Sequence, residues 1–212
     1  MTNPDLTHIE FLLDRSGSME SIKSDIEGGF DAYIADQKAR PGQCTVSLAQ
    51  FDDRYESVFT GVPIAEVPPL ALTPRGMTAL LDGIGRTVNE LGARLAGLPE
   101  NERPGTVIFA IMTDGLENAS REFTHGVVKA MITHQEQVYN WQFLYMGADQ
   151  DAIEVGSSLG IASEHTMTWS RGRVKQAYAA MSRMSGDLRA APAGSSLSDI
   201  GFSEAERESA AS

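Results

Sequence analysis

Residues 11–20 read FLLDRSGSME, an apolar run that stops at Asp14 and is followed at alternate positions by Ser16 and Ser18. Apolar residues that run together rather than alternate predict a short strand buried on both faces, here over residues 9–14. Side chains at alternate positions of an extended turn can converge on one point, as they do in calcium-binding loops. The same serines also suit a plain helix cap, because serine is a favoured residue at a strand-to-helix junction.

Length and charge limit the classes of protein that this chain can represent. It has 212 residues, of which 42% are hydrophobic, and a formal net charge of −12. This size predicts one domain, which we place at residues 1–189, followed by a small-residue, polar and flexible tail over 190–212. The negative charge argues against nucleic acid and against an anionic membrane surface as partners, since both would repel it. A bound cation and a merely solvated acidic surface are both compatible with it.

Cysteine usage and hydropathy predict a cytoplasmic location. Cys44 is the only cysteine, so neither an intrachain disulfide nor a multi-cysteine zinc site can form. The first ten residues, MTNPDLTHIE, lack the basic start and the apolar stretch of a signal peptide. No run of roughly 18 apolar residues is present, so we expect no transmembrane helix.

The order of apolar patterns predicts an α/β fold. Expected strands cover residues 9–14, 44–51, 55–62, 106–114 and 141–149, and expected helices cover 18–40, 78–98, a segment ending near 137, 152–159 and 171–188. Strands that alternate with helices imply a doubly wound, mostly parallel central sheet with helices on both faces. The hairpin of 44–51 and 55–62, which turns at residues 52–54, adds one antiparallel edge strand.

Three of the expected strands end in aspartates, namely Asp14, Asp114 and Asp149. Ligands of open α/β sheets bind outside the carboxyl ends of the strands, although each aspartate could instead cap the next helix. A hard divalent cation prefers oxygen ligands, and one carboxylate with two hydroxyls fills only part of a six-coordinate shell. Two later segments offer more oxygen: LTPRGMTALLDGIG (72–85), with Thr78 before a helix, and AIMTDGLENAS (110–120), with Asp114 at a strand end.

The segments DRSGS (14–18), GMTALLDGIG (76–85) and TDG (113–115) together resemble a von Willebrand factor A domain and its metal-ion-dependent adhesion site. The resemblance spans roughly residues 7–162 and implies a Rossmann-like fold. It also implies five metal ligands, which are Asp14, Ser16, Ser18, Thr78 and Asp114. For an intracellular member of this family, the resemblance implies an assembly or regulatory subunit that binds Mg²⁺, with Mn²⁺ or Ca²⁺ possible. The partner protein then supplies a Glu or Asp carboxylate to the ion.

The chemistry of this ligand set is consistent with such a role. Serine and threonine hydroxyls are neutral, so the charge of the ion is incompletely compensated wherever an aspartate reaches it only through water. The ion then seeks a further anionic ligand, and Mg²⁺ readily keeps a water that such a ligand can replace.

Several other residues favour ordinary structural roles. Asp52 and Asp53 could form an auxiliary cation site, but a hairpin turn is the preferred interpretation. Glu117 could lie just outside the metal ligands, although an acid in the first turn of a helix is explained by the helix dipole. The Asp149 segment resembles a loop of the family in which we expect a cap. The four histidines show no metal-ligand spacing.

Two other functional classes remain as alternatives. Phosphatases of the haloacid dehalogenase type also place an aspartate nucleophile at the end of the first strand beside Mg²⁺, but they need a second aspartate two residues later, where this chain has Ser16. A structural domain with a non-functional metal site is the other alternative. We therefore interpret the sequence as a metal-dependent protein-binding module and not as an enzyme.

Overall fold

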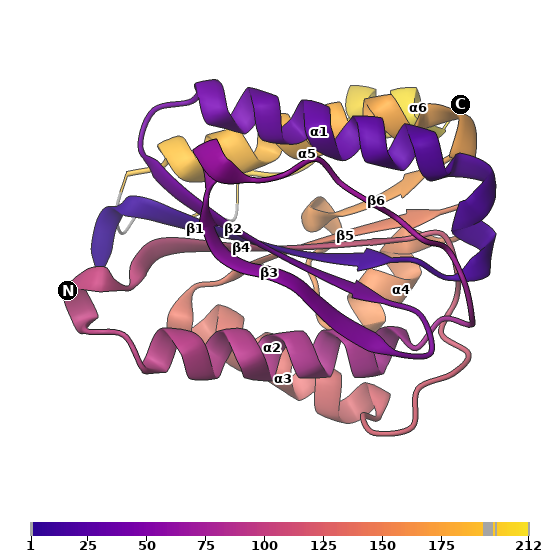
Figure 1. Ribbon diagram of the computed structural model, residues 1–212, viewed down its shortest axis with the longest axis horizontal. Helices are drawn as coiled ribbons and strands as arrows, with labels where there is room; N and C mark the ends of the chain where they lie inside the picture. Colours follow the sequence, from indigo (N-terminus) through magenta and orange to yellow (C-terminus); the bar gives the residue numbers. More distant parts are fainter. Residues whose placement is uncertain (1, 193–196, 198, 212) are drawn as a thin grey trace.

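The computed structural model describes residues 2–192, 197 and 199–211, which form one sheet between two helical layers (Figure 1). The strands are β1 (Asn3–Asp14), β2 (Gln43–Phe51), β3 (Tyr55–Pro63), β4 (Pro104–Thr113), β5 (Gln142–Ala148) and β6 (Thr166–Trp169). The helices are α1 (Lys23–Ala39), α2 (Leu80–Ala96), α3 (His125–Tyr139), α4 (Ala152–Ser158), α5 (Val174–Ala190) and α6 (Glu204–Ala211). None of the helices in these residues is long and apolar enough to cross a membrane.

The sheet has the order β3-β2-β1-β4-β5-β6 and confirms the predicted fold class. Neighbouring strands are parallel except for β2 and β3, which form the predicted antiparallel hairpin at one edge. The chain moves outward from β1 to β2 and β3, then returns to the other side of β1 with β4. In open α/β sheets this reversal point is where ligands bind, so the carboxyl ends of β1 and β4 are the first place to search.

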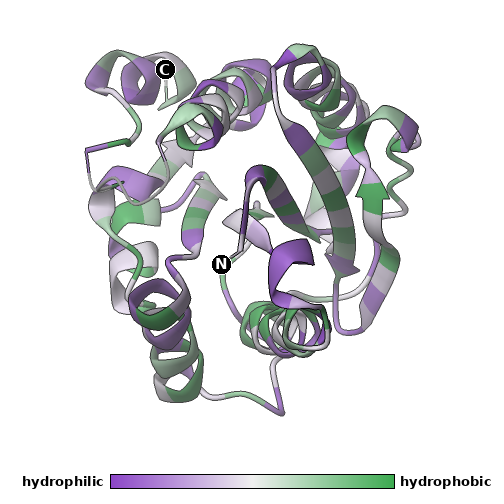
Figure 2. Cartoon of the chain, turned by 90° about the vertical axis from the view of Figure 1, so that its left-hand side faces the viewer, coloured by the Kyte–Doolittle hydropathy of each residue, from purple (hydrophilic) through white to green (hydrophobic). Residues whose placement is uncertain are grey.

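Two hydrophobic cores hold the helices against the sheet. Alternate β1 residues, such as Phe11 and Leu13, face α1 and α5, whereas Leu12 faces α2 and α3. Because β1, β4 and β5 are covered on both faces, their apolar residues run together, which explains the continuous patterns seen in the sequence. Figure 2 views the molecule from the end of the sheet and shows both layers, whose helices carry hydrophobic and hydrophilic residues alike.

The structure departs from the sequence-based elements in four places. Residues 17–22 form a 3₁₀ helix before α1, and α3 begins only at His125, which leaves 114–124 as a loop. The short strand β6 was not predicted.

The fourth difference lies in the segment that we expected to be a flexible tail. Its described residues include the helix α6, whose Ala210 is fully buried, and Phe202, which joins the core next to α5. Polar contacts support this position, because the Arg183 guanidinium donates to Glu206 and that of Arg207 donates to the Thr166 carbonyl oxygen. These contacts connect residues that are far apart in sequence, so no local sequence pattern could have predicted them.

Candidate metal centre

The predicted ligands meet at the carboxyl ends of the two central strands. β1 ends at Asp14, and β4 ends at Thr113, directly before Asp114. Leu13 pairs with Met112 in adjacent parallel strands, so the two aspartates emerge side by side from the sheet. This is the reversal point of the sheet described above.

Hydrogen bonds join four of the predicted groups in a continuous chain. The Asp14 carboxylate accepts from the Ser16 backbone N–H at 2.6 Å, and the Ser16 hydroxyl lies 3.1 Å from the Ser18 hydroxyl. Ser18 Oγ in turn donates to Asp114 Oδ1 at 2.6 Å. Asp14, Ser16 and Asp114 are buried, so their polar groups face one another rather than open solvent.

The capping interpretations of the serines and of Thr78 are not supported. Ser16 occupies the N-cap position of the 3₁₀ helix but makes no side-chain capping bond, and the N-cap of α1 is Ile22. The N-cap of α2 is Ala79, so the Thr78 hydroxyl lies one residue outside the helix. These hydroxyls are therefore available for another role.

Thr78 is brought to the other ligands by the loop that follows β4. Its backbone N–H donates to the Asn118 side-chain oxygen, and its carbonyl accepts from the Asn118 N–H, each at 3.0 Å. A Cβ atom added to Gly115 would lie only 2.9 Å from Thr78 Oγ1. The Thr78 hydroxyl thus packs against the residue next to Asp114, and glycine is what permits that approach.

The same loop and the first turn of α2 cap each other. Glu117 accepts from the Leu81 N–H, while Asp82 accepts from the backbone N–H groups of Arg121, Glu122 and Phe123. Glu117 therefore stabilises the N-terminus of α2, not that of the helix that follows it in sequence, which corrects the first-turn interpretation. This reciprocal capping holds the Thr78 and Asp114 segments together.

Asp52 secures the loop that carries Thr78 from the opposite side. The buried Asp52 carboxylate accepts from Arg15 Nε at 2.9 Å, from Arg75 Nε at 2.8 Å and from the Arg54 N–H at 2.7 Å. Burial alone would raise the pKa of Asp52, but these hydrogen bonds and the Arg15 charge lower it overall. With its oxygens engaged in this way, Asp52 belongs to a hairpin turn, as the sequence favoured, rather than to a second cation site.

Burial dominates the electrostatics of Asp14. The pKa of Asp14 is raised from 3.8 to about 6 overall: burial is the largest cause and the Asp114 charge adds to it, whereas hydrogen bonds from Thr113 and Ser16 lower it. Thr113 Oγ1 donates to Asp14 Oδ2 at 2.6 Å. Sequence analysis missed Thr113, although its place inside TDG could have suggested a role.

Arg171 is the second residue that sequence analysis missed. Its Nη2 lies 3.1 Å from Asp114 Oδ2, and its Nε lies 3.4 Å from Asp149 Oδ2. The cap that we expected in this segment is Asp151, which accepts from the Glu154 N–H, and Asp149 itself contacts Arg171. Arg171 follows β6 and carries no local motif, so only the folded chain reveals it.

The donor set fits a small, hard cation. Neighbouring ligands of an octahedral Mg²⁺ ion lie about 3.0 Å apart, given metal–oxygen distances of about 2.1 Å. The spacings of 3.1 Å between the two serine hydroxyls and 2.6 Å between Ser18 and Asp114 are close to this value. Within the described ranges, no group of three or more His, Cys, Asp or Glu side chains could hold a metal, which leaves this hydroxyl-rich cluster as the candidate.

Comparison with solved structures identifies the fold, whereas no family model and no curated protein matches the sequence. Proximal thread matrix protein 1 from the mussel byssus superimposes with a TM-score of 0.59 at 15% identity, over 85% of this chain and 46% of that one. The von Willebrand factor domain of the pilus tip protein Mfa5 from Porphyromonas gingivalis gives 0.58 at 13% identity, over 85% and 95%. The chain has the von Willebrand factor A fold.

Other structures with the von Willebrand factor A fold add two facts. The ArnB paralog VWA2 from Sulfolobus acidocaldarius gives a TM-score of 0.55 at 16% identity, over 84% of this chain and 44% of that one. This chain thus spans less than half of that protein and of the mussel protein. A further structure of the mussel protein, at a TM-score of 0.57 and 15% identity, has zinc in its metal-ion-dependent adhesion site.

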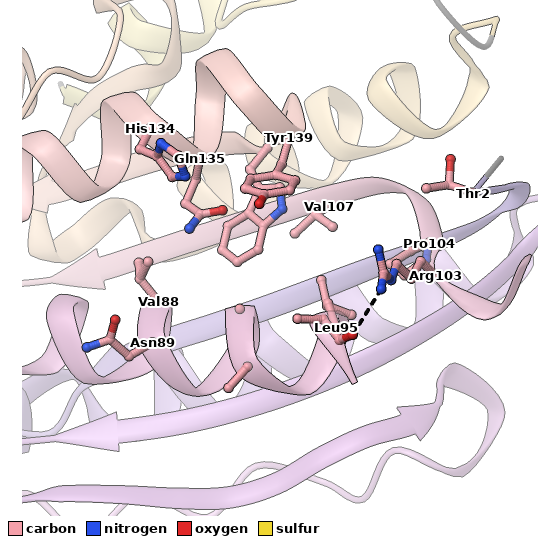
Figure 3. Close-up of a pocket in the computed structure, with 14 residues that line it drawn as sticks. Thr2, Val88, Asn89, Leu95, Arg103, Pro104, Val107, His134, Gln135 and Tyr139 are labelled. Carbon is pink, nitrogen blue, oxygen red and sulfur yellow. Dashed lines mark hydrogen bonds between the residues drawn. The ribbon is translucent and has the colours of Figure 1, made fainter. Parts of the chain in front are cut away.

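A hollow at the other end of the domain does not share these features. It encloses about 350 Å³ between the C-terminal halves of α2 and α3, where Val107, Tyr139 and Trp141 form apolar walls (Figure 3). Arg103 lines it too, but its guanidinium donates to the Ala96 and Leu98 carbonyl oxygens. The hydroxyl-rich cluster remains the better candidate because its polar groups converge.

Proposed function

We propose that this chain is a metal-dependent protein-interaction module that uses Asp14, Ser16, Ser18, Thr78 and Asp114 as ligands. The observation that carries the proposal is the convergence of two aspartates and two serines at the reversal point of the sheet, with Thr78 packed against Gly115, the residue after Asp114. The zinc-containing site of the mussel protein supports divalent metal binding by this fold.

Mg²⁺ is the ion that we propose, with Mn²⁺ or Ca²⁺ as alternatives, because every donor is a hard oxygen. Once bound, the ion supplies an electrophilic position that a carboxylate can fill. Other residues of the chain position the ligands. Thr113 and Ser16 hold Asp14 in place by hydrogen bonds, and the loop over 114–124 holds Thr78 against Gly115. The other three ligands are neutral hydroxyls, so the charge of the ion is only partly neutralised wherever an aspartate reaches it through water.

The surroundings of the site support a protein as the occupant of that position. Met77 and Leu116, which flank Thr78 and Asp114 in sequence, are large apolar residues with 51% and 61% of their surface exposed. Exposed apolar side chains around a polar centre are typical of docking surfaces. We propose that a partner presents a Glu or Asp carboxylate to the ion and covers these residues, and that this occurs in the cytoplasm.

The phosphatase alternative is weaker. The position two residues after Asp14 holds the Ser16 hydroxyl, which is a poor general acid near neutral pH. We therefore propose a binding role rather than catalysis.

A metal-dependent pull-down tests the function. The immobilised chain should capture its partner in Mg²⁺, release it in EDTA, and fail to capture it as Thr78→Ala, which removes one ligand without changing charge. Thr124→Ala is the matched control, because Thr124 is exposed and makes no side-chain capping bond. A partner that stays bound both in EDTA and to Thr78→Ala would contradict the proposal.

A further inference from the structure

One positively charged side chain already contacts a proposed metal ligand. The Arg171 guanidinium lies 3.1 Å from Asp114 Oδ2, while Asp114 Oδ1 accepts from Ser18 Oγ at 2.6 Å. The Asp114 side chain is fully buried, so its charge depends on these two neighbours. Arg171 therefore occupies one oxygen of a carboxylate that the ion also needs.

The backbone next to Arg171 is held by hydrogen bonds, while its side chain is partly exposed and contacts two carboxylates. The preceding Ser170 donates through its N–H to the Ala210 carbonyl at 2.9 Å, and Trp169 accepts from the Asp149 N–H at 2.9 Å. The side chain of Arg171 is 41% exposed, and that of its second acidic neighbour, Asp149, is 47% exposed. Arg171 therefore already bridges a buried and an exposed carboxylate, and it can lose the contact with Asp114 while it keeps the one with Asp149.

We propose that Arg171 is an internal cation that competes with the metal ion for Asp114 and turns toward Asp149 when the ion binds. This inference rests on the proposed function and concerns how its site is regulated. In the metal-free protein, Arg171 neutralises the buried carboxylate; in the metal-bound protein, the ion takes that role and Asp149 retains the guanidinium. The strength of the Arg171–Asp114 pair thus sets the metal concentration at which the site fills.

A consequence for partner binding follows from linkage. A partner carboxylate that docks on the ion lies beside the released guanidinium and can accept from it. A partner that holds Arg171 away from Asp114 raises the affinity of the site for the metal. By linkage, the bound metal raises the affinity for that partner by the same factor. Through Arg171, the binding of an acidic partner and the binding of the metal therefore strengthen each other.

Titration with Mg²⁺ alone, by calorimetry, tests this competition without a partner. Arg171→Gln should bind Mg²⁺ more tightly by about fivefold, which is the scale of a partly exposed ion pair. Arg121→Gln is the control for loss of one positive charge, because Arg121 is exposed and contacts Asp82 through its backbone.

A double variant separates local competition from overall charge. Arg171→Gln with Asp149→Asn has the net charge of the natural chain, so a bulk charge effect predicts unchanged affinity. Competition predicts affinity as tight as that of Arg171→Gln, because Asp149 acts only through Arg171. A double variant with natural affinity, or an Arg171→Gln affinity no tighter than that of Arg121→Gln, would overturn the proposal.

Thermal melts supply a second readout. If Arg171 competes, Arg171→Gln melts at a lower temperature than the natural chain without metal but at the same temperature in saturating Mg²⁺. A purely structural arginine would lower both temperatures alike. If the natural chain binds no divalent ion, both the proposed function and this inference fail. If Asp14→Ala abolishes binding while Arg171→Gln leaves it unchanged, this inference alone fails.

Discussion

At the scale of single residues, the site keeps a carboxylate where the fold alone would not favour one. Asp14 is fully buried and is stabilised by two neutral donors, the Ser16 N–H and the Thr113 hydroxyl. Its pKa is raised to about 6, so burial in the metal-free fold disfavours the carboxylate, although the carboxylate is still the major form at pH 7. Such a raised pKa is typical of functional positions, because an ion can later supply the missing positive charge.

We expect Asp14→Asn to stabilise the metal-free protein at pH 8. The folded pKa of Asp14 lies above the unfolded value, so its contribution to stability is present below pH 3.8 and is lost as the pH rises through about 6. This loss corresponds to about 3 kcal/mol at most, and the neutral amide avoids it. Melting temperatures at pH 8 and pH 4, without metal, should show a higher value for Asp14→Asn at pH 8 only.

Melts in Mg²⁺ are the control for that variant. Mg²⁺ should raise the melting temperature of the natural chain and leave the melting temperature of Asp14→Asn unchanged. A metal-free variant that melts lower than the natural chain at pH 8 would show that the hydrogen bonds of Asp14 outweigh its burial.

Gly115→Ala should weaken metal binding while leaving the domain folded. The new methyl group would lie 2.9 Å from Thr78 Oγ1, so the threonine must shift away from the other ligands. We expect about a tenfold loss of Mg²⁺ affinity, which corresponds to about 1.4 kcal/mol. The control is Gly126→Ala in α3, where an added Cβ meets no atom within 4 Å. Equal affinities of the two variants in calorimetry would contradict the predicted position of Thr78.

At the scale of elements, the site depends on two segments that cap each other. The first turn of α2 receives Glu117 and Ser120 from the loop over 114–124, and its Asp82 accepts three backbone N–H groups of that loop. This exchange adds to the Thr78–Asn118 and Ser18–Asp114 hydrogen bonds, which also hold the loop that carries Asp114. The ligand positions of Thr78 and Asp114 are therefore coupled through α2.

Asp82→Ala should loosen this coupling. Burial raises the pKa of Asp82, but its backbone hydrogen bonds lower it overall, so its contribution to stability is present above pH 3.8 and is lost as the pH falls through the folded pKa. We expect a loss of about 1–2 kcal/mol at pH 7, similar to the loss of a helix cap, together with weaker Mg²⁺ binding. Urea unfolding measures the first effect and calorimetry the second.

Asp25→Ala is the matched control, because Asp25 lies in the first turn of α1, away from the loop over 114–124. If Asp82→Ala leaves Mg²⁺ affinity unchanged, the capping exchange stabilises the fold without positioning the ligands.

At the scale of the whole molecule, α6 closes the far edge of the sheet beside the metal site. Ala210 packs against the core, and its carbonyl accepts from the N–H of Ser170, the residue before Arg171. The last helix is thus part of the support of Arg171, although it is short and mostly polar.

Substitutions within α6 distinguish a docked helix from a flexible tail. Ala210→Asp should lower the melting temperature and speed hydrogen exchange over 204–211, because it buries a charge without a partner. Ala205→Asp makes the same change at an exposed position of the same helix and should have little effect. Equal behaviour of the two variants would instead support the mobile segment that the polar composition predicted.

The sequence by itself determined most of the strands and helices and the candidate ligands. Buried strands appear as continuous apolar runs, and a strand end followed by oxygen-bearing side chains is a local pattern, so Asp14, Ser16 and Ser18 stand out without a structure. The order of strands and helices was sufficient for a mostly parallel sheet with one antiparallel edge, but not for the short strand β6.

Only the tertiary structure decided which distant groups act together. Ser18 and Asp114 are 96 residues apart, Arg171 and Asp114 are 57 apart, and neither pair has a local signature. The same holds for the capping of α2 by Glu117 and for the docking of α6. The physical reason is that local patterns report burial and backbone preference, whereas hydrogen bonds and ion pairs depend on which segments the folded sheet brings within about 3 Å of each other.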